Sequence, residues 1–167
     1  GEKWYQSIYW PQLLKKAGYK LYLWDNQKNF DKHHGNTFYE MYSHQVVNVC
    51  YDKMNETAYD YDEDIVAKKK KNGYVNYGSK NYVWFHLMGQ HFAFADKCPN
   101  DKKVFQIKDI KRTDGYLTNE MKQVIADYDN AVHYNDEVLK SIIDLFRNTN
   151  SVLVFISDHG EEAYDYR

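Results

Sequence analysis

Apolar positions along the chain switch between helical and extended spacing. Residues 7–17 place apolar side chains at helical spacing and end at Gly18, and residues 19–24 follow as a short apolar run typical of a β-strand. Residues 59–71 are acidic at the start and lysine-rich at the end, a charge order that suits the helix dipole. The pattern therefore predicts helices over 7–17 and 59–71 and a strand over 19–24.

The second half of the chain continues this alternation. Residues 81–85 are predicted to form a strand buried on both faces, which ends at His86. A long amphipathic pattern predicts a helix over 119–147. The run 151–156 is continuous, apolar and rich in β-branched residues, so it is predicted to be a central parallel strand.

Strands that alternate with helices predict an α/β fold with a mostly parallel sheet and helices on both faces. The polar stretch 29–57 is expected to consist of loops with one short element at 45–49. With 167 residues, the chain is long enough for one domain over 1–167. In such sheets ligands bind beyond the carboxyl ends of the strands, so candidate chemistry is sought there.

Charge and composition narrow the possible partners. The formal net charge is −2, from 22 basic and 24 acidic residues, so no overall basic field argues for nucleic acid as a partner. The lysine run 68–71 is interpreted as a solvated helix end rather than a nucleic-acid patch. No apolar run approaches the roughly 20 residues that span a bilayer. Cys50 and Cys98 are either one disulfide or two buried thiols.

Two predicted strand ends carry residues suited to chemistry, and both are expected to converge on one edge of the sheet. Asp158 and His159 directly follow the run 151–156, and a carboxylate oxygen with an imidazole nitrogen suits Zn²⁺, or Mn²⁺ with more oxygen ligands. His86 and His91 flank a glycine-containing loop, where one could bind metal and the other could contact a phosphate or protonate a leaving group. Ordinary polar loops at strand ends remain an open alternative for both segments.

Several motifs, in this order, resemble the periplasmic catalytic domain of bacterial phosphoethanolamine transferases, which belong to the alkaline phosphatase and sulfatase superfamily. The motifs are Leu14–Lys20 with Asn26-Gln27, then His86–His91, then Tyr128-Asp129-Asn130 with Tyr134-Asn135-Asp136, then Ser157–Glu161. The resemblance covers most of the chain. It implies a three-layer α/β/α sandwich with a mostly parallel sheet, alkaline-phosphatase-like and incomplete in this chain.

The resemblance also implies roles for individual residues. Asp158 and His159 match the adjacent pair that binds catalytic zinc in that family, and another divalent cation such as Mn²⁺ is an alternative. His91 matches the second histidine of a family motif at the substrate phosphate. His86 matches the first histidine of that motif, for which a supporting role in substrate binding is expected.

The activity that the resemblance implies is lipopolysaccharide modification at the periplasmic face of the bacterial inner membrane. A threonine of the family attacks phosphatidylethanolamine, holds phosphoethanolamine covalently and passes it to lipid A or a core sugar. The implied partners are thus a phospholipid donor, a lipid A or glycan acceptor, and a membrane reached through helices absent from this chain. The sequence does not indicate an oligomeric state.

Some positions depart from the family pattern. The family's acidic zinc ligand and its nucleophile have no matching motif before Trp4, and Gln90 replaces a serine or asparagine. The chain is therefore expected to be a partial catalytic domain that lacks the nucleophile segment and a C-terminal part, inactive alone and weak in zinc binding. A sulfatase or phosphoesterase hydrolase of the same superfamily is one alternative, and a non-catalytic glycan- or lipid-binding module is another.

Overall fold

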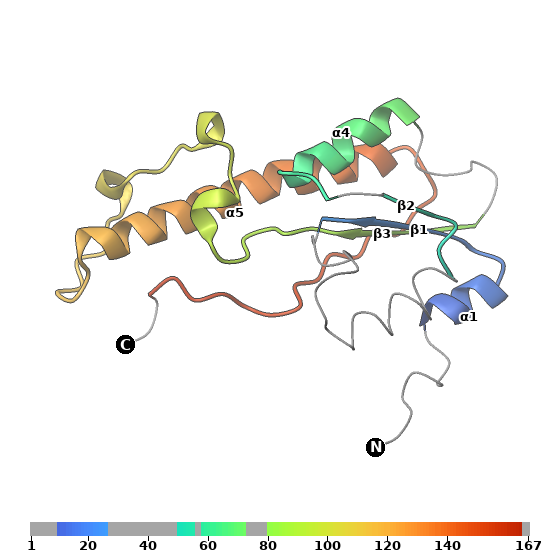
Figure 1. Ribbon diagram of the computed structural model, residues 1–167, viewed down its shortest axis with the longest axis horizontal. Helices are drawn as coiled ribbons and strands as arrows, with labels where there is room; N and C mark the ends of the chain where they lie inside the picture. The colour runs from blue at the N-terminus through green and yellow to red at the C-terminus, as the bar shows by residue number, and fades with distance from the viewer. Residues whose placement is uncertain (1–9, 27–49, 56–57, 73–79, 165–167) are drawn as a thin grey trace, which may run out of the picture. The chain divides into compact units, whose positions relative to one another are not determined.

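The computed structural model describes residues 10–26, 50–55, 58–72 and 80–164 (Figure 1). These residues belong to two compact units. The first unit comprises residues 1–60 and 67–87, and the second comprises residues 61–66 and 88–167. No helix among the described residues combines the length and the apolar character needed to cross a membrane.

Helix α1 (Trp10–Lys16) ends where the sequence predicts. Gly18 adopts a φ of +84°, a left-handed conformation that residues with a Cβ rarely take. Its N–H donates to the carbonyl of Lys15 at 3.0 Å, and the N–H of Tyr19 donates to the carbonyl of Leu14 at 3.0 Å. This pair of hydrogen bonds is a Schellman motif, which ends the helix and turns the chain directly into the first strand.

The sheet of the first unit has three parallel strands in the order β2-β1-β3 (Figure 1). They are β1 (Lys20–Asp25), β2 (Lys53–Met54) and β3 (Asn81–His86). The predictions of strands at 19–24 and 81–85 and of parallel pairing are confirmed. β2 lies in the stretch predicted to be loops. It was not predicted because a strand of two residues leaves no periodic pattern in the sequence. The element expected at 45–49 lies outside the described residues.

The prediction that residues 81–85 are buried on both faces is wrong. In the described sheet β1 is the central strand, and its last five residues are buried. β3 pairs with β1 on one side only, and most of its side chains are half-buried, with Trp84 37% exposed. An apolar strand is fully buried only when both of its faces are covered. Among the described residues this holds for β1 and not for β3.

Two helices organise the second unit. Helix α5 (Asn119–Phe146) follows its N-cap residue Thr118, whose hydroxyl accepts the N–H of Met121 at 3.3 Å. Its buried face confirms the predicted long amphipathic helix. Helix α4 (Asp62–Asn72) begins in this unit and confirms the helix expected at 59–71, although its regular turns begin later. Three short 3₁₀ turns that were not predicted lie between β3 and α5: Phe94–Asp96, Asn100–Lys102 and Ile107–Asp109.

The prediction of a central strand at 151–156 is also wrong. These residues have no regular secondary structure, and Val152 is 92% exposed. A β-strand exists only where a neighbouring strand pairs with its backbone, and no described segment does so here. The apolar pattern is thus necessary for such a strand but not sufficient.

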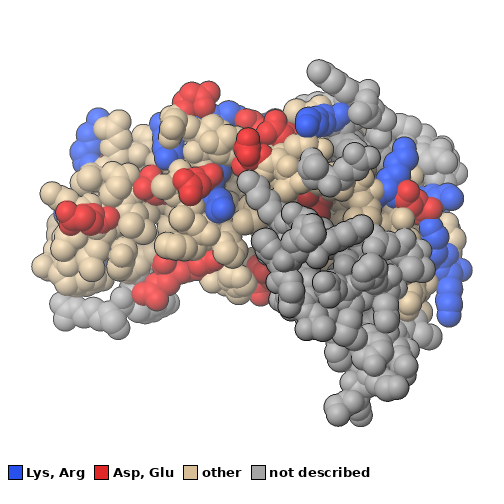
Figure 2. All heavy atoms as spheres, viewed as in Figure 1, with Lys and Arg blue, Asp and Glu red and all other residues tan. Residues whose placement is uncertain are grey.

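The described surface carries both signs of charge. On the face that Figure 2 shows, the described lysine and arginine side chains are interspersed with aspartate and glutamate side chains. Lys68, in the predicted lysine-rich helix end, lies within α4 with its ammonium 4.3 Å from the ring centre of Tyr59. Cys50 and Cys98 are both free and buried thiols.

Candidate metal and phosphate site

In the first unit, Asp25 and His86 meet at the carboxyl ends of β1 and β3. The parallel register pairs Asp25 with His86, and the Nδ1 of His86 lies 2.9 Å from the Oδ1 of Asp25. Asp25 is only 4% exposed, whereas the side chain of His86 is 32% exposed. Because a carboxylate accepts the Nδ1 proton, the Nε2 of His86 keeps its lone pair in the neutral ring. Asp25 was not predicted as the partner of His86, although it directly follows the apolar run 19–24 in the sequence.

In the second unit, His91 follows a tight turn beyond β3. Its N–H donates to the carbonyl of Met88 at 3.0 Å, and Gly89 within the turn has a φ of +51°. The Nδ1 of His91 lies 2.7 Å from the carbonyl oxygen of Phe92. A carbonyl can only accept, so Nδ1 is the protonated nitrogen and Nε2 is left with its lone pair.

His159 has the same arrangement as His91. Its Nδ1 lies 2.9 Å from the carbonyl oxygen of Gly160, so its Nε2 is likewise the nitrogen with a lone pair. Metal-binding histidines usually donate their second ring N–H in this way, which fixes the tautomer and the ring orientation. The ring centroids of His91 and His159 are 6.4 Å apart, with the ring planes at 70°. Two segments far apart in the sequence therefore bring two imidazoles side by side.

Asp158 contacts the second of these histidines. Its Oδ1 accepts the N–H of His159 at 3.0 Å, and its Oδ2 lies 3.7 Å from the Nε2 of His159. The hydroxyl of Ser157 donates to the carbonyl of His159 and closes the turn. The carbonyl of Gly160 and then the Asp158 carboxylate raise the pKa of the exposed His159 ring, because both stabilise its protonated form.

The oxygen of Asp158 and the nitrogen of His159 fit zinc as part of a ligand set. Both side chains are accessible, at 81% and 55% exposed. Among the described residues, no group of three or more histidine, cysteine, aspartate or glutamate side chains is placed to hold a metal ion. The structure thus places His91 beside His159, which Asp158 also contacts, while His86 belongs to the other unit with Asp25.

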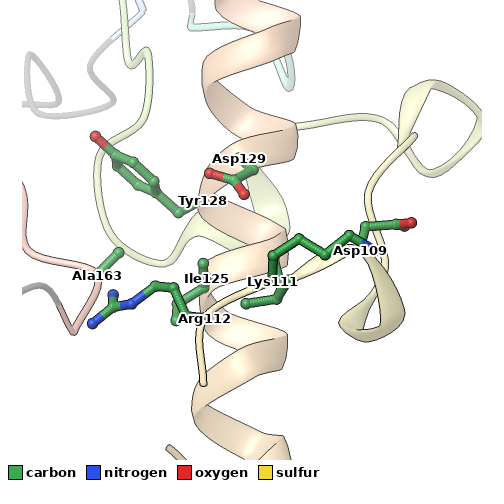
Figure 3. Close-up of a pocket in the computed structure, with 8 residues that line it drawn as sticks. Asp109, Lys111, Arg112, Ile125, Tyr128, Asp129 and Ala163 are labelled. Carbon is green, nitrogen blue, oxygen red and sulfur yellow. The ribbon is translucent and has the colours of Figure 1, made fainter. Parts of the chain in front are cut away.

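A cavity of about 360 Å³ lies in the second unit, lined by α5, by the segment 109–112 and by Ala163 (Figure 3). Tyr128 of α5 is on its wall, and from the segment 109–112 the side chain of Arg112 extends toward the segment that carries Ala163. The guanidinium of Arg112 donates to the carbonyl of Tyr164 at 2.8 Å, so it connects the segment 109–112 to the segment that carries Ala163. None of the predicted site residues lines this cavity.

Residues 5–167 match the sulfatase family model. The chain belongs to the sulfatase family. Within the family it is similar to phosphoethanolamine transferase EptC of Escherichia coli O18:K1:H7 (strain RS218), with 32% identity over 157 residues that make up 92% of this chain and 26% of that protein. It is also similar to the Kdo(2)-lipid A phosphoethanolamine 7''-transferase of Escherichia coli (strain K12), with 29% identity over 52% of this chain.

Solved structures show the same relationship. The C-terminal periplasmic domain of EptC from Escherichia coli matches with 30% identity and a TM-score of 0.76, over 98% of this chain and 46% of that one. The same domain in complex with zinc matches with 29% identity and a TM-score of 0.72. The predicted fold class is thereby confirmed. The chain spans about a quarter of the length of the curated EptC relatives, at 26%.

Proposed function

We propose that this chain is part of the catalytic domain of a metal-dependent phosphoethanolamine transferase that acts at the periplasmic face of a bacterial inner membrane. The donor would be phosphatidylethanolamine and the acceptor lipid A or a core sugar. The observation that carries the proposal is the approach of His91 to His159, at 6.4 Å between ring centroids, with Asp158 beside them. The similarity to EptC supports the same assignment.

Each residue has a distinct role in this proposal. Asp158 and His159 would hold zinc through a carboxylate oxygen and Nε2. His91, whose ring centroid is 6.4 Å from that of His159, would hold the substrate phosphate, and His86 would support the substrate with its orientation fixed by Asp25. Zinc bound there would lower the pKa of the nucleophilic hydroxyl and neutralise charge on the phosphoryl oxygens.

The reaction would proceed in two transfers. In the first, the bond from phosphorus to the diacylglycerol oxygen breaks as phosphorus bonds to a threonine oxygen. In the second, the acceptor hydroxyl or phosphate takes phosphoethanolamine from that threonine. No residue of this chain is assigned as the nucleophile.

The test is an assay of the full-length protein with tail-labelled phosphatidylethanolamine and lipid A. Labelled diacylglycerol reports donor cleavage, and mass spectrometry of lipid A reports transfer. We expect both products, and we expect His159→Ala to abolish transfer and His91→Ala to reduce it to a low but measurable rate. His133→Ala is the matched control, since His133 is exposed on α5 and packs edge-on against Phe105.

Each alternative function predicts a different result. With lipid A that carries its core oligosaccharide as acceptor, diacylglycerol and free phosphoethanolamine without modification of lipid A or of the core sugars would indicate a hydrolase. No donor cleavage in the wild-type protein, together with retained binding of lipid A vesicles, would indicate a non-catalytic module. Either result would refute the proposed transferase.

A further inference from the structure

The turn that carries His91 is held by a buried carboxylate from a different part of the chain. Asp62, the first residue of α4, accepts the N–H of Met88 on Oδ1 at 3.1 Å and the N–H of Gly89 on Oδ2 at 2.8 Å. Asp62 is only 5% exposed. Hydrogen bonds from backbone N–H groups to a carboxylate are about twice as strong as neutral ones, so this contact fixes two consecutive peptide groups of the turn.

A second side chain holds the same turn from α5. The Nδ2 of Asn135 donates to the Oε1 of Gln90 at 3.3 Å, and a Cβ on Gly89 would lie 3.9 Å from the Oδ1 of Asn135. The preceding helix residue, Tyr134, accepts the N–H of Glu63 on its hydroxyl at 3.4 Å. Helix α5 therefore contacts both the turn and the residue that follows Asp62.

These contacts determine where the imidazole of His91 lies. The turn closes through the hydrogen bond from His91 N–H to Met88 O, so His91 is itself the last residue of the turn. A shift of the Met88 and Gly89 peptides would therefore move the ring of His91 relative to His159. We propose that Asp62 is a positioning residue, which holds His91 in place for the substrate phosphate through the 88–91 turn. We call the two hydrogen bonds from Met88 and Gly89 to Asp62 the clamp. The effect of the clamp on activity rests on the proposed function, whereas the existence of the clamp does not.

The clamp is tested by amide hydrogen exchange on the 167-residue chain. Asp62→Asn keeps the shape of the side chain, but one of its two terminal atoms becomes a donor that faces a donor N–H. Exchange at Met88 and Gly89 is expected to accelerate about tenfold or more. Asp64→Asn is the matched control, since it removes the same charge from the first turn of α4 and should leave these two amides unchanged. Unchanged exchange at Met88 and Gly89 in Asp62→Asn would refute the clamp.

The positioning role is tested by a double-mutant cycle in the full-length protein. In the protein that retains His91, Asp62→Asn is expected to lower kcat for transfer about tenfold or more, with a smaller change in KM. In the His91→Ala background it should have little further effect, because its influence passes through His91. If Asp62→Asn lowers kcat by the same factor with and without His91, its effect does not pass through His91. That result would show that Asp62 serves folding only and would overturn the proposal.

Two further outcomes have their own readout: an Asp62→Asn variant that does not fold, and a wild-type protein that shows no activity. If the Asp62→Asn variant does not fold, the Gly89→Ala variant takes its place in both experiments. Alanine at position 89 strains the same turn, because Gly89 has a positive φ. Its effect on transfer is expected to depend on His91 in the same way. A wild-type protein that cleaves no donor would refute the proposed function. In that case the exchange experiment alone decides whether the clamp exists.

Discussion

Asn130 offers a quantitative test of how the second unit is built. Its side chain is 1% exposed on α5. Its Oδ1 accepts the N–H of Val104 at 2.7 Å and the N–H of Phe105 at 2.8 Å, and its Nδ2 donates to the carbonyl of Phe105 at 2.9 Å. One amide thus ties an irregular segment to the helix through three hydrogen bonds.

Asn130→Ala removes all three hydrogen bonds at once. Each contributes about 1 kcal/mol net, and a freed backbone group that stays dry costs up to about 3 kcal/mol. Water can reach part of this segment, because the side chains of Val104 and Phe105 are exposed. The expected loss in the free energy of unfolding is therefore about 2–4 kcal/mol, a large share of the roughly 5–15 kcal/mol typical of a domain.

Urea denaturation followed by circular dichroism measures this loss. With an m-value of about 2 kcal/mol/M, in the middle of the usual range for urea, the midpoint should fall by about 1–2 M while the slope stays constant. Asn150→Ala, at an exposed turn position, is the matched control and should change stability by less than about 0.5 kcal/mol. An Asn130→Ala midpoint equal to that of the wild type would refute the reasoning.

Two further predictions concern α5. Ile142→Ala, at a buried position, should destabilise the chain by about 2–4 kcal/mol in urea denaturation, whereas Ile143→Ala, at an exposed position, should cost less than about 1 kcal/mol; equal losses would contradict the assigned burial. Hydrogen bonds from Lys140 and then Arg147 lower the pKa of Asp144 to about 2, so its contribution to stability is present above its ordinary pKa near 4 and is lost as the pH falls toward 2. The difference in urea midpoint between wild type and Asp144→Asn should therefore shrink between pH 5 and pH 2, and a constant difference would show that the pairing is not responsible.

Local signals account for the parts of the fold that the sequence predicts well. The long periodic pattern predicts α5, because a helix of this length repeats its apolar face many times. Gly18 marks the end of α1 because only glycine takes the required φ without strain. The apolar runs at β1 and β3 predict strands whose pairing the structure confirms.

Long-range partners explain the rest. The run 151–156 has the composition of a buried strand, but a strand also needs a neighbour, which composition does not encode. β2 consists of two residues that are defined by their pairing with β1. Asp62 resembles an ordinary acidic residue at a helix start, and only the fold shows that its carboxylate contacts Met88 and Gly89.

The candidate site was predicted for a reason that is only partly correct. The ends of two strands were expected to bring the two histidine-bearing segments together, yet the residues directly before Asp158 form no strand. His91 and His159 nevertheless lie side by side. Their common Nδ1 hydrogen bonds to backbone carbonyls could not be read from the sequence, because they depend on the conformation of each turn.

The central claim is that His91 and the Asp158–His159 pair serve one bound phosphate and metal ion. The most direct measurement is NMR of this chain with ¹⁵N-labelled histidine, titrated with zinc and then with inorganic phosphate. We expect zinc to shift the Nε2 resonance of His159, and phosphate added to the zinc-bound chain to shift that of His91, with His133 unmoved throughout. A His91 resonance that stays constant at concentrations of zinc and phosphate that saturate the shift of His159 would contradict the shared site.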